Sequence, residues 1–500
     1  MSSNSARDSD LALPELGVGV TYMPALEPLL YRFPDLVDVI EIEPQTLWIS
    51  NDRQKDKYRA LDGVFENIAA LPFRKLVHSV GVPVGGSVKP EPQNLSLLAR
   101  NVELLQSPWV SDHLSFNATP EFHTGFFLPP RQTQEGIDNA VAAIRELQIA
   151  IKVPVAVETG VNYFQSRADE IPDGLFVADI AKRSGCGILL DLHNLYCNQI
   201  NGRQTIDEFL AQISFQHVWE VHLAGGLEMD GYWLDAHSGA IPVPLVELCR
   251  HIFPRLTNLK AVIFEIFPSF VAEVGLETVR KQIEVVRELW ELRGRSSDSQ
   301  IGHTFKPPEI TTTVSEQWPP TQWEEALGAL VIGRNCNTDI AAQLARDPAV
   351  SLVRGLIHEF RGSMVVSVLR LTSRLLMLCL GADGFTLVLR EFWSKNSPRQ
   401  FASDEAEAFA EYLIALDLTV PHLMKTLEFE RAAVATLLTG ESRVVRFDFD
   451  PFPLFRALSA GRLPELIGRP GKFEIELDSN DPVSESGLDV DSVRRAFPFH

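Results

Sequence analysis

The amino-acid sequence predicts an α/β protein in which a (β/α)8 TIM barrel is followed by a mostly α-helical C-terminal domain. Three observations support this fold class. Eight short apolar runs typical of buried strands alternate with segments of helical periodicity over residues 14–292, which matches the size and order of a (β/α)8 barrel. Six of these runs, the third to the eighth, carry His, Asp or Glu near their carboxyl ends, as barrel strands do where they carry functional residues. After residue 293 helical patterns dominate.

The predicted strands are apolar runs that stop abruptly at polar or turn-forming residues. In Gly185–Asn194, the apolar residues suit a parallel sheet covered on both faces, and Asp191 is costly to bury without a positive partner such as a metal. Helical periodicity between strands is seen in Gly136–Leu147 and Thr205–Gln212. A doubly wound open sheet is less favoured, because no glycine-rich phosphate turn opens the first helix. The eight runs are Gly17–Met23, Val37–Pro44, Lys75–Val80, Trp109–Leu114, Val153–Gly160, Gly187–Asn194, Val218–Ala224 and Leu259–Pro268.

The composition limits the classes of protein to which the chain can belong. The 500 residues are 45% hydrophobic and 22% charged, an ordinary globular mixture. With a net charge of −21 and no basic cluster interleaved with aromatic residues, nucleic acid is not an expected partner. No apolar run reaches the ~18 residues that cross a bilayer, and the N-terminus lacks the apolar segment of a secretory signal. Five scattered cysteines indicate reduced thiols, so we expect a cytoplasmic protein without a membrane partner.

Composition shifts divide the chain into five predicted segments. Residues 1–13 are a disordered N-terminus, 14–292 the barrel with its metal site, 293–320 a linker, 321–477 a helical domain and 478–500 an acidic tail. In the helical domain a break is expected near Gly362, and Arg443–Asp450 is a candidate hairpin arm. The helical segments expected there are Thr321–Ile332, Asp339–Leu344, Val350–Leu380, Asp404–Leu416 and Pro421–Leu438.

Side chains that bind metals follow the third to the eighth predicted strands. The carboxyl ends of barrel strands share one rim, so these side chains are expected to lie together. One His or carboxylate at a strand end is commonly structural, but the same ending on six successive strands is hard to obtain by accident. The candidate ligands are His78, His113, Glu158, Asp191, Asn194, His222, Asp235, His237 and Glu265.

Nine donors exceed what a single ion binds. One metal takes about four to six donors, so two or three metals are expected, with a carboxylate bridging a pair. Imidazole and carboxylate donors without thiolate suit iron, manganese or zinc. Asn194 is a poor donor, Asp191 has the alternative role of orienting a neighbouring ligand, and strand alternation would turn His193 away from Asp191.

The ligand order, together with three local motifs, resembles the multinuclear non-haem iron oxidative enzymes, a family that includes the iron enzyme of methanobactin biosynthesis. The motifs are Asp191-Leu192-His193-Asn194, His222-Leu223-Ala224-Gly225 and Asp235-Ala236-His237. The likeness covers about residues 15–290 and extends to xylose-isomerase-like barrels, including the three-metal apurinic endonuclease. Thr159-Gly160 departs from the Asn-Pro that often follows the bridging Glu, and Asn194 is closer to the iron enzymes than the His of the nuclease pattern.

The resemblance implies a ligand arrangement and a set of cofactors. Glu158 would bridge two metals, of which one also binds Asp191, His222 and Glu265 and the other also binds His78 and His113. A third would be held by Asn194, Asp235 and His237. Glu158, Asp191, His222 and Glu265 are the implied catalytic residues. The implied cofactors are two or three iron ions, mixed Fe(II) and Fe(III), with O2 as co-substrate.

A second resemblance concerns the C-terminal domain. Val420–Leu423 and Leu427–Ala432 resemble the helical partner subunits encoded beside these iron enzymes. This implies a partner-like domain fused in cis that helps to engage a ribosomally made precursor peptide. A dimerisation or stability module is the alternative.

Together these features predict a multinuclear iron-dependent oxidase or oxygenase that modifies a ribosomally synthesised precursor peptide, at Cys or a C-terminal residue, using O2. The alternatives are a zinc or manganese phosphodiesterase or endonuclease on the same barrel, a sugar isomerase-like enzyme, and a non-catalytic metal-binding scaffold. The negative charge and Asn194 weigh against the nuclease, and the isomerase normally uses fewer ligands.

Overall fold

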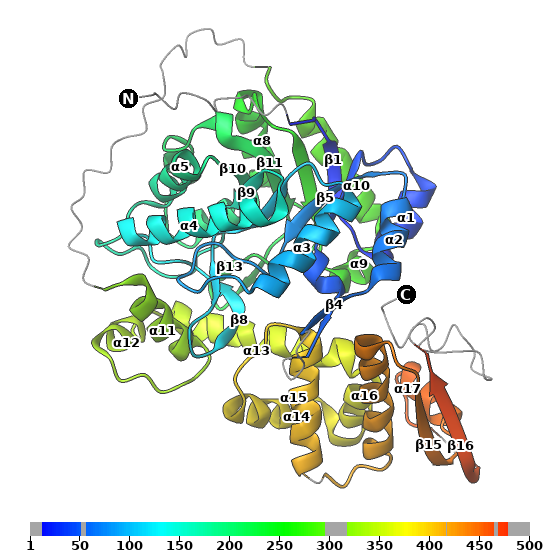
Figure 1. Cartoon of the computed structure of the whole chain (residues 1–500). Coiled ribbons are helices and arrows are strands. Elements are labelled where there is room, and N and C mark those ends of the chain that lie inside the picture. Colours follow the sequence, from blue (N-terminus) through cyan, green and yellow to red (C-terminus); the bar gives the residue numbers. More distant parts are fainter. Residues whose placement is uncertain (1–12, 52–56, 296–317, 417, 465–468, 479–500) are drawn as a thin grey trace.

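The computed structural model describes residues 13–51, 57–295, 318–416, 418–464 and 469–478. In these residues a closed barrel of parallel strands is surrounded by helices, and a second group of helices lies against one end of the barrel (Figure 1). The predicted fold class, a (β/α)8 barrel followed by a mostly helical region, is confirmed. The predicted N-terminal segment, linker and acidic tail fall almost entirely outside the described residues, so the five-segment division stays a prediction.

Eight strands close the barrel in the order β1-β14-β11-β10-β9-β6-β5-β2, with β2 paired to β1. All eight predicted runs form strands. Most strands are shorter than the apolar runs, because apolar sequence continues into the adjoining turns. The strands are β1 (Gly17–Thr21), β2 (Val39–Ile42), β5 (Arg74–Ser79), β6 (Val110–His113), β9 (Val155–Glu158), β10 (Gly187–Asp191), β11 (Val218–Ala224) and β14 (Ala261–Glu265).

The helices of the barrel bury one apolar face each against the strands. In α4 (Gln134–Ile151) the buried side chains Ile137, Val141, Ile144 and Leu147 follow the helical period, and burial of each contributes roughly 1.5–3 kcal/mol. The Thr133 hydroxyl accepts a hydrogen bond from the Gly136 N–H and so begins α4. The other helices are α1 (Glu27–Arg32), α2 (Asp62–Ala70), α3 (Pro92–Leu105), α5 (Asp173–Ser184), α6 (Leu192–Ile200), α7 (Ile206–Leu210), α8 (Val243–Ile252), α9 (Pro268–Val274) and α10 (Leu276–Trp290).

Three small hairpins extend from the carboxyl ends of the barrel strands, and the sequence did not predict them. Most of their strands are three residues long, which is too short for a readable alternation. They pair antiparallel as β3 (Trp48–Ser50) with β4 (Tyr58–Ala60), β7 (Phe116–Ala118) with β8 (His123–Leu128), and β12 (Leu227–Met229) with β13 (Tyr232–Leu234).

The C-terminal region is helical and ends in an antiparallel hairpin. The long pattern from Val350 breaks at Leu369, not near Gly362 as predicted; Leu369 has non-helical φ/ψ, whereas Gly362 continues inside α13. Arg443–Asp450 does supply a hairpin arm. In the described residues no single helix is long and apolar enough to span a membrane, and α13 with α14 meets that test only as a pair bent by 112°. The elements are α11 (Pro320–Val331), α12 (Asp339–Leu344), α13 (Ala349–Val368), α14 (Arg370–Lys395), α15 (Ala402–Leu416), α16 (Leu423–Thr439), β15 (Arg443–Phe449), α17 (Phe452–Ser459) and β16 (Pro470–Leu477).

The helical region packs on the loops at the carboxyl ends of the barrel strands. One apolar cluster combines barrel residues such as Phe116, Tyr163 and Leu234 with Trp323 and Ile357 of the helices. Hydrogen bonds join the two parts at Ser50 with Ser403, at Gly81 with Gln400 and at Ser87 with Glu324. The helices therefore lie over the end of the barrel where functional side chains are expected (Figure 1).

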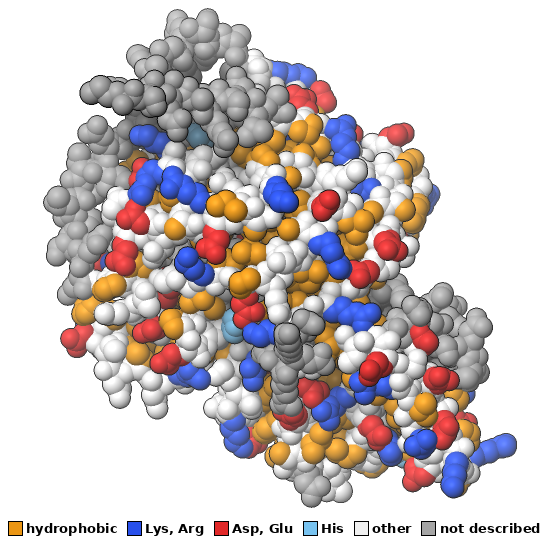
Figure 2. Space-filling view, in the orientation of Figure 1, with side chains coloured by type: hydrophobic (Ala, Val, Ile, Leu, Met, Phe, Trp, Pro, Cys, Tyr) orange, Lys and Arg blue, Asp and Glu red, His pale blue; other side chains and the backbone are white. Residues whose placement is uncertain are grey.

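The face in Figure 2 shows Lys and Arg interspersed with Asp and Glu over both the barrel and the helices. Interspersed charge of this kind presents no continuous basic track on that face for a phosphate backbone.

Glu324 links α11 to the barrel and makes a pH-dependent contribution to stability. It is buried, and both carboxylate oxygens accept from the Ser87 N–H. Burial raises the pKa of Glu324 from 4.5 to about 7, although the Ser87 hydrogen bonds oppose this. The unfolded chain therefore releases the proton at lower pH than the folded chain. The free energy of unfolding should fall by about 3 kcal/mol between pH ~4.5 and ~7 and then level off.

Urea unfolding across this pH range, in wild type and Glu324→Gln, measures the effect. Over this range the free energy of unfolding of Glu324→Gln should fall by about 3 kcal/mol less than that of the wild type, whereas that of Glu325→Gln, altered at the neighbouring position on the same helix, should match the wild type. Equal slopes in the wild type and Glu324→Gln would show that Glu324 stays ionised when folded.

Candidate metal centre

The nine predicted ligands lie at or just beyond the carboxyl ends of six barrel strands, β5, β6, β9, β10, β11 and β14. His78 lies in β5, and Asn194 lies in the first turn of α6, three residues after β10 ends. Asp235 and His237 follow the hairpin strand β13. Most of the nine side chains are buried, and His113, Asp235 and His237 are partly exposed toward the mouth, with 16–19% of each side chain accessible. Closure of the barrel thus collects residues that are separated by up to 187 positions in the sequence.

The carboxylate of Glu158 lies at the centre of this cluster. Its Oε2 is 3.1 Å from His113 Nε2 and 3.4 Å from His78 Nε2. On its other side, Asn194 Nδ2 donates to Glu158 Oε1 over 3.2 Å. Glu158 therefore faces two imidazoles with one oxygen and an amide with the other.

A second group forms around His222. Its Nδ1 is 3.2 Å from Glu265 Oε2, and candidate ligand atoms of Glu158, Asp191 and His222 all lie within 4.8 Å of one another. Asp191 accepts the Asn194 N–H with Oδ1 and so begins α6, which leaves Oδ2 without a hydrogen-bond partner among the described residues. The same carboxylate thus fixes a helix and presents a free oxygen.

A third group lies nearer the mouth. Asp235 Oδ1 is 3.0 Å from His237 Nε2, which is also 3.6 Å from Glu265 Oε2. His237 has a φ of 46°, an uncommon backbone conformation for a non-glycine residue that places its ring at the mouth. His193 Nδ1 approaches Asp235 Oδ1 to 2.9 Å.

The contact of His193 with Asp235 corrects the strand interpretation of this segment. Strand alternation assumed that β10 continued to Asn194, but the strand ends at Asp191 and α6 begins at Leu192. In a helix, side-chain directions advance by about 100° per residue instead of alternating. His193 is therefore turned toward Asp235 and belongs to the same polar cluster.

Burial and mutual charge shift the pKa values of the cluster in opposite directions. Burial raises the pKa of Glu158 well above its usual value, and it raises that of Asp191 to about 7, with Asp235 adding to the effect. His222 and His237 outweigh burial at Glu265 and lower its pKa to about 2. Burial lowers the pKa of His113 to about 4. Burial without a positive partner therefore disfavours the ionised forms of Glu158 and Asp191.

Two further carboxylates lie behind His222, and the sequence interpretation missed them. His222 Nε2 is 3.2 Å from Glu41 Oε1 and 3.4 Å from Glu220 Oε1, while Trp109 Nε1 donates to Glu220 Oε2 over 3.0 Å. Both carboxylates are fully buried. The sequence signal that could have identified Glu220 is a charged residue inside an apolar strand, two positions before the candidate ligand His222. By contacting Nε2, these carboxylates orient the imidazole so that its Nδ1 faces the centre of the cluster.

The residues present fit a metal centre. Among the described residues Asp191 Oδ2 and Asn194 Oδ1 are buried without a hydrogen-bond partner, and Glu158 Oε2 and His222 Nδ1 form no hydrogen bond although other candidate ligands lie 3.1–3.4 Å away. Buried polar atoms normally find partners. These orphaned atoms converge from neighbouring strands with an imidazole and carboxylate donor set suited to iron, manganese or zinc. Candidate ligand atoms of His78, His113 and Glu158 also lie within 4.8 Å of one another.

A barrel with such side chains at the carboxyl ends of its strands has the architecture of a TIM-barrel enzyme. The chain belongs to the family described as RiPP precursor modification enzyme MbnB/TglH/ChrH, whose model matches residues 17–270.

Relatives in other bacteria carry only the description UPF0276 protein. One from Streptomyces avermitilis is 28% identical over 262 residues, which is 50% of this chain and 54% of the relative, so the chain spans about half of that protein. One from Chromobacterium violaceum is 27% identical over 239 residues, 48% of this chain and 87% of the relative. One from Vibrio vulnificus is 30% identical over 239 residues, 47% of this chain and 79% of the relative.

Solved structures with a similar barrel are more distant. The D-psicose 3-epimerase of Clostridium cellulolyticum is 12% identical with a TM-score of 0.37, over 55% of this chain and 99% of the epimerase. The IolI protein with a bound zinc atom is 14% identical with a TM-score of 0.37, over 55% of this chain and 98% of that protein. These likenesses are too distant to bear on the chemistry.

The contact of Glu41 with His222 should affect metal affinity without affecting access to the site. In Glu41→Gln the acceptor on His222 Nε2 loses its charge, and we expect divalent-metal affinity to fall by about tenfold. Competition with a coloured chelator measures the affinity. Glu103→Gln, exposed on α3, is the control. Unchanged affinity in Glu41→Gln would mean that His222 does not bind metal through Nδ1.

Proposed function

We propose that this protein is a multinuclear iron-dependent oxidase or oxygenase that modifies a ribosomally synthesised precursor peptide with O2. The observation that carries the proposal is the convergence of orphaned imidazole, carboxylate and amide atoms on Glu158, in a chain whose family modifies RiPP precursors. The absence of thiolate from the donor set favours iron over a closed structural zinc site.

The three groups of donors would hold the metals. Glu158 would be common to two sites. One of these sites would also contain Asp191, His222 and Glu265, and the other would also contain His78 and His113. The third site would be formed by Asn194, Asp235 and His237. Bound iron ions would supply the redox chemistry with O2 that amino-acid side chains lack. His193, through its contact with Asp235, orients that carboxylate.

Aromatic rings and a tyrosine define the surroundings of the centre. Phe127 lies against His113 with ring centroids 4.1 Å apart, and Phe267 lies 4.5 Å from His237. Each ring covers part of an imidazole that is partly exposed at the mouth. The Tyr163 hydroxyl accepts the Asp235 N–H over 3.1 Å and fixes the backbone beside the mouth. The chain therefore holds its donors rigidly before any substrate arrives.

The helical region supports a peptide as the substrate. Because it packs on the loops at the mouth, a peptide that reaches the centre would pass between barrel loops and helices. We propose that this region acts as the precursor-binding partner fused in cis.

Reconstitution with Fe(II) under anaerobic conditions tests the function. After admission of O2, mass spectrometry of a precursor peptide encoded beside the gene should show an oxygen-dependent mass change. Zinc and manganese should not support it. Activity of the zinc-loaded protein on abasic DNA, with no change in any peptide, would favour the nuclease alternative.

Replacement of Glu158 separates metal binding from folding. Glu158→Gln should lose at least one metal per chain by elemental analysis and lose the metal-dependent rise in Tm. The metal-free variant should be at least as stable as metal-free wild type, because the substitution removes a buried carboxylate whose neighbours include Asp191 and Glu265. Glu66→Gln, exposed on α2, is the matched control. Full metal content in Glu158→Gln would contradict its bridging role.

A further inference from the structure

A cavity of about 170 Å³ lies at the seam between the barrel and the helical region. Its barrel wall is the segment after β9, including Phe164 and Arg167, and its helical wall includes Trp323, Gln343 and Arg346. Pockets for whole small molecules usually measure about 300–1,000 Å³. This cavity, called the seam cavity below, is therefore the size of a single side chain or chain terminus.

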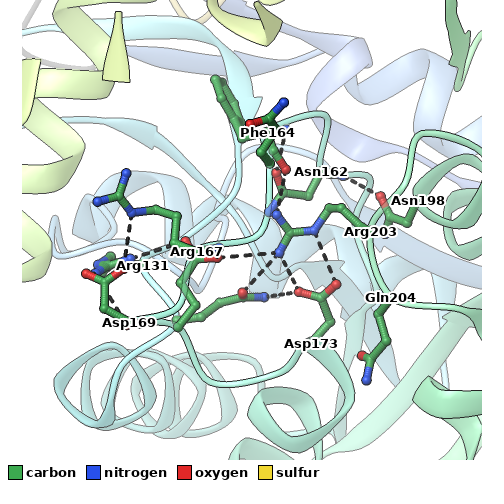
Figure 3. A network of polar contacts seen from close by, with 12 residues as sticks. Arg131, Asn162, Phe164, Arg167, Asp169, Asp173, Asn198, Arg203 and Gln204 are labelled. Atoms are coloured by element: carbon green, nitrogen blue, oxygen red, sulfur yellow. Dashed lines mark hydrogen bonds and ion pairs between the residues drawn. The ribbon is translucent and has the colours of Figure 1, made fainter. Parts of the chain in front are cut away.

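The barrel wall of the seam cavity is held by a buried polar network (Figure 3). Arg203 donates to the Phe164 carbonyl over 2.7 Å and to Asp173 over 2.8 Å. Asn198 accepts the Asn162 N–H over 2.7 Å, and Arg131 pairs with Asp169. The wall is thus fixed before a ligand binds.

The acceptor side chains around the cavity are already occupied. Glu170 accepts from Arg131 and from the Arg167 N–H. Asp347 accepts the N–H groups of Gln165 and Ala349, and Gln343 Oε1 accepts from Arg167. Each of these acceptors thus already receives at least one hydrogen bond from the protein.

Donor groups remain free on the opposite wall. Trp323 is 4% exposed, and its indole N–H has no hydrogen-bond partner among the described residues. Arg346 is exposed, and within the described part of the chain its guanidinium makes no ion pair. An unpaired N–H and a guanidinium on residues that line the same cavity match a ligand that only accepts hydrogen bonds and carries negative charge.

We propose that the seam cavity is a subsite that binds one carboxylate of the precursor peptide, held by the Arg346 guanidinium and the Trp323 indole N–H. The carboxylate comes from an Asp or Glu side chain or from the peptide C-terminus. The proposal rests on the proposed function for the identity of the ligand as a peptide.

The subsite adjoins the candidate metal centre along the chain. Asn162, on the cavity wall, is four residues from Glu158, a separation of at most about 14 Å in an extended chain. Tyr163 lies between them in sequence and contacts Asp235. A carboxylate anchored here would place neighbouring residues of the same peptide near the centre.

Tryptophan side-chain NMR on the full chain tests the subsite without turnover. Trp323→Phe identifies the Trp323 indole N–H resonance. Titration with N-acetylglutamate α-amide and with N-acetylglycine should shift that resonance saturably, and the stronger ligand shows which carboxylate source is preferred. The neutral N-acetylglutamine amide should leave it unchanged.

Arg346→Glu should weaken the carboxylate titration by about tenfold or more. Arg390→Glu, which makes the same change of charge on the exposed face of α14, should not. A resonance that no carboxylate shifts, or that the neutral amide shifts equally, would overturn the proposal.

The precursor peptide distinguishes failure of the subsite from failure of the proposed function. Arg346→Glu should raise the KM for the peptide at similar kcat, and should raise the Kd of a fluorescein-labelled peptide under anaerobic conditions. Unchanged KM and Kd would overturn the subsite and leave the function standing. A weakened Kd without any oxygen-dependent modification would overturn the function and leave the subsite standing.

Discussion

The buried carboxylate of Glu158 is the group on which the arrangement of the barrel mouth depends. Burying a charge costs several kcal/mol unless partners compensate it, and in this chain burial raises the pKa of Glu158. His78 and His113 approach one of its oxygens and Asn194 the other. The closed barrel is what holds those partners together, since they come from β5, β6 and the helix after β10.

The helical region makes the barrel mouth a junction between two parts of one chain. Its helices share an apolar cluster with the hairpins and loops that follow the barrel strands. Hydrogen bonds to Ser50 of β3, and to Gly81 and Ser87 in the segment between β5 and α3, hold two parts of the barrel mouth to these helices. Under the proposed function, a site at this junction would take metal-binding groups from the barrel and recognition groups from the helices, which suits a long, flexible substrate better than a compact one.

The sequence predicted the barrel well because buried parallel strands are continuous apolar runs, and it predicted the position of the nine candidate ligands at one rim because they lie near the ends of those runs. The sequence interpretation failed where a contact depends on closure of the barrel, or where the chain changes from strand to helix periodicity. Glu41 of β2 contacts His222 of β11 only because the closed barrel brings their side chains together, and Glu220 contacts the same imidazole from within β11. The orientation of His193 could not be read from strand alternation because a helix begins one residue before it. The seam cavity joins residues that are more than 150 positions apart.

Anomalous diffraction at the iron edge, from crystals grown with Fe(II) under anaerobic conditions, tests the central claim most directly. The account predicts at least two peaks on the order of 4 Å apart, one on each side of the Glu158 carboxylate. One peak would be next to His78 and His113, and the other next to Asp191 and His222. A peak between Glu41 and Glu220, or no peak within bonding distance of Glu158, would contradict it.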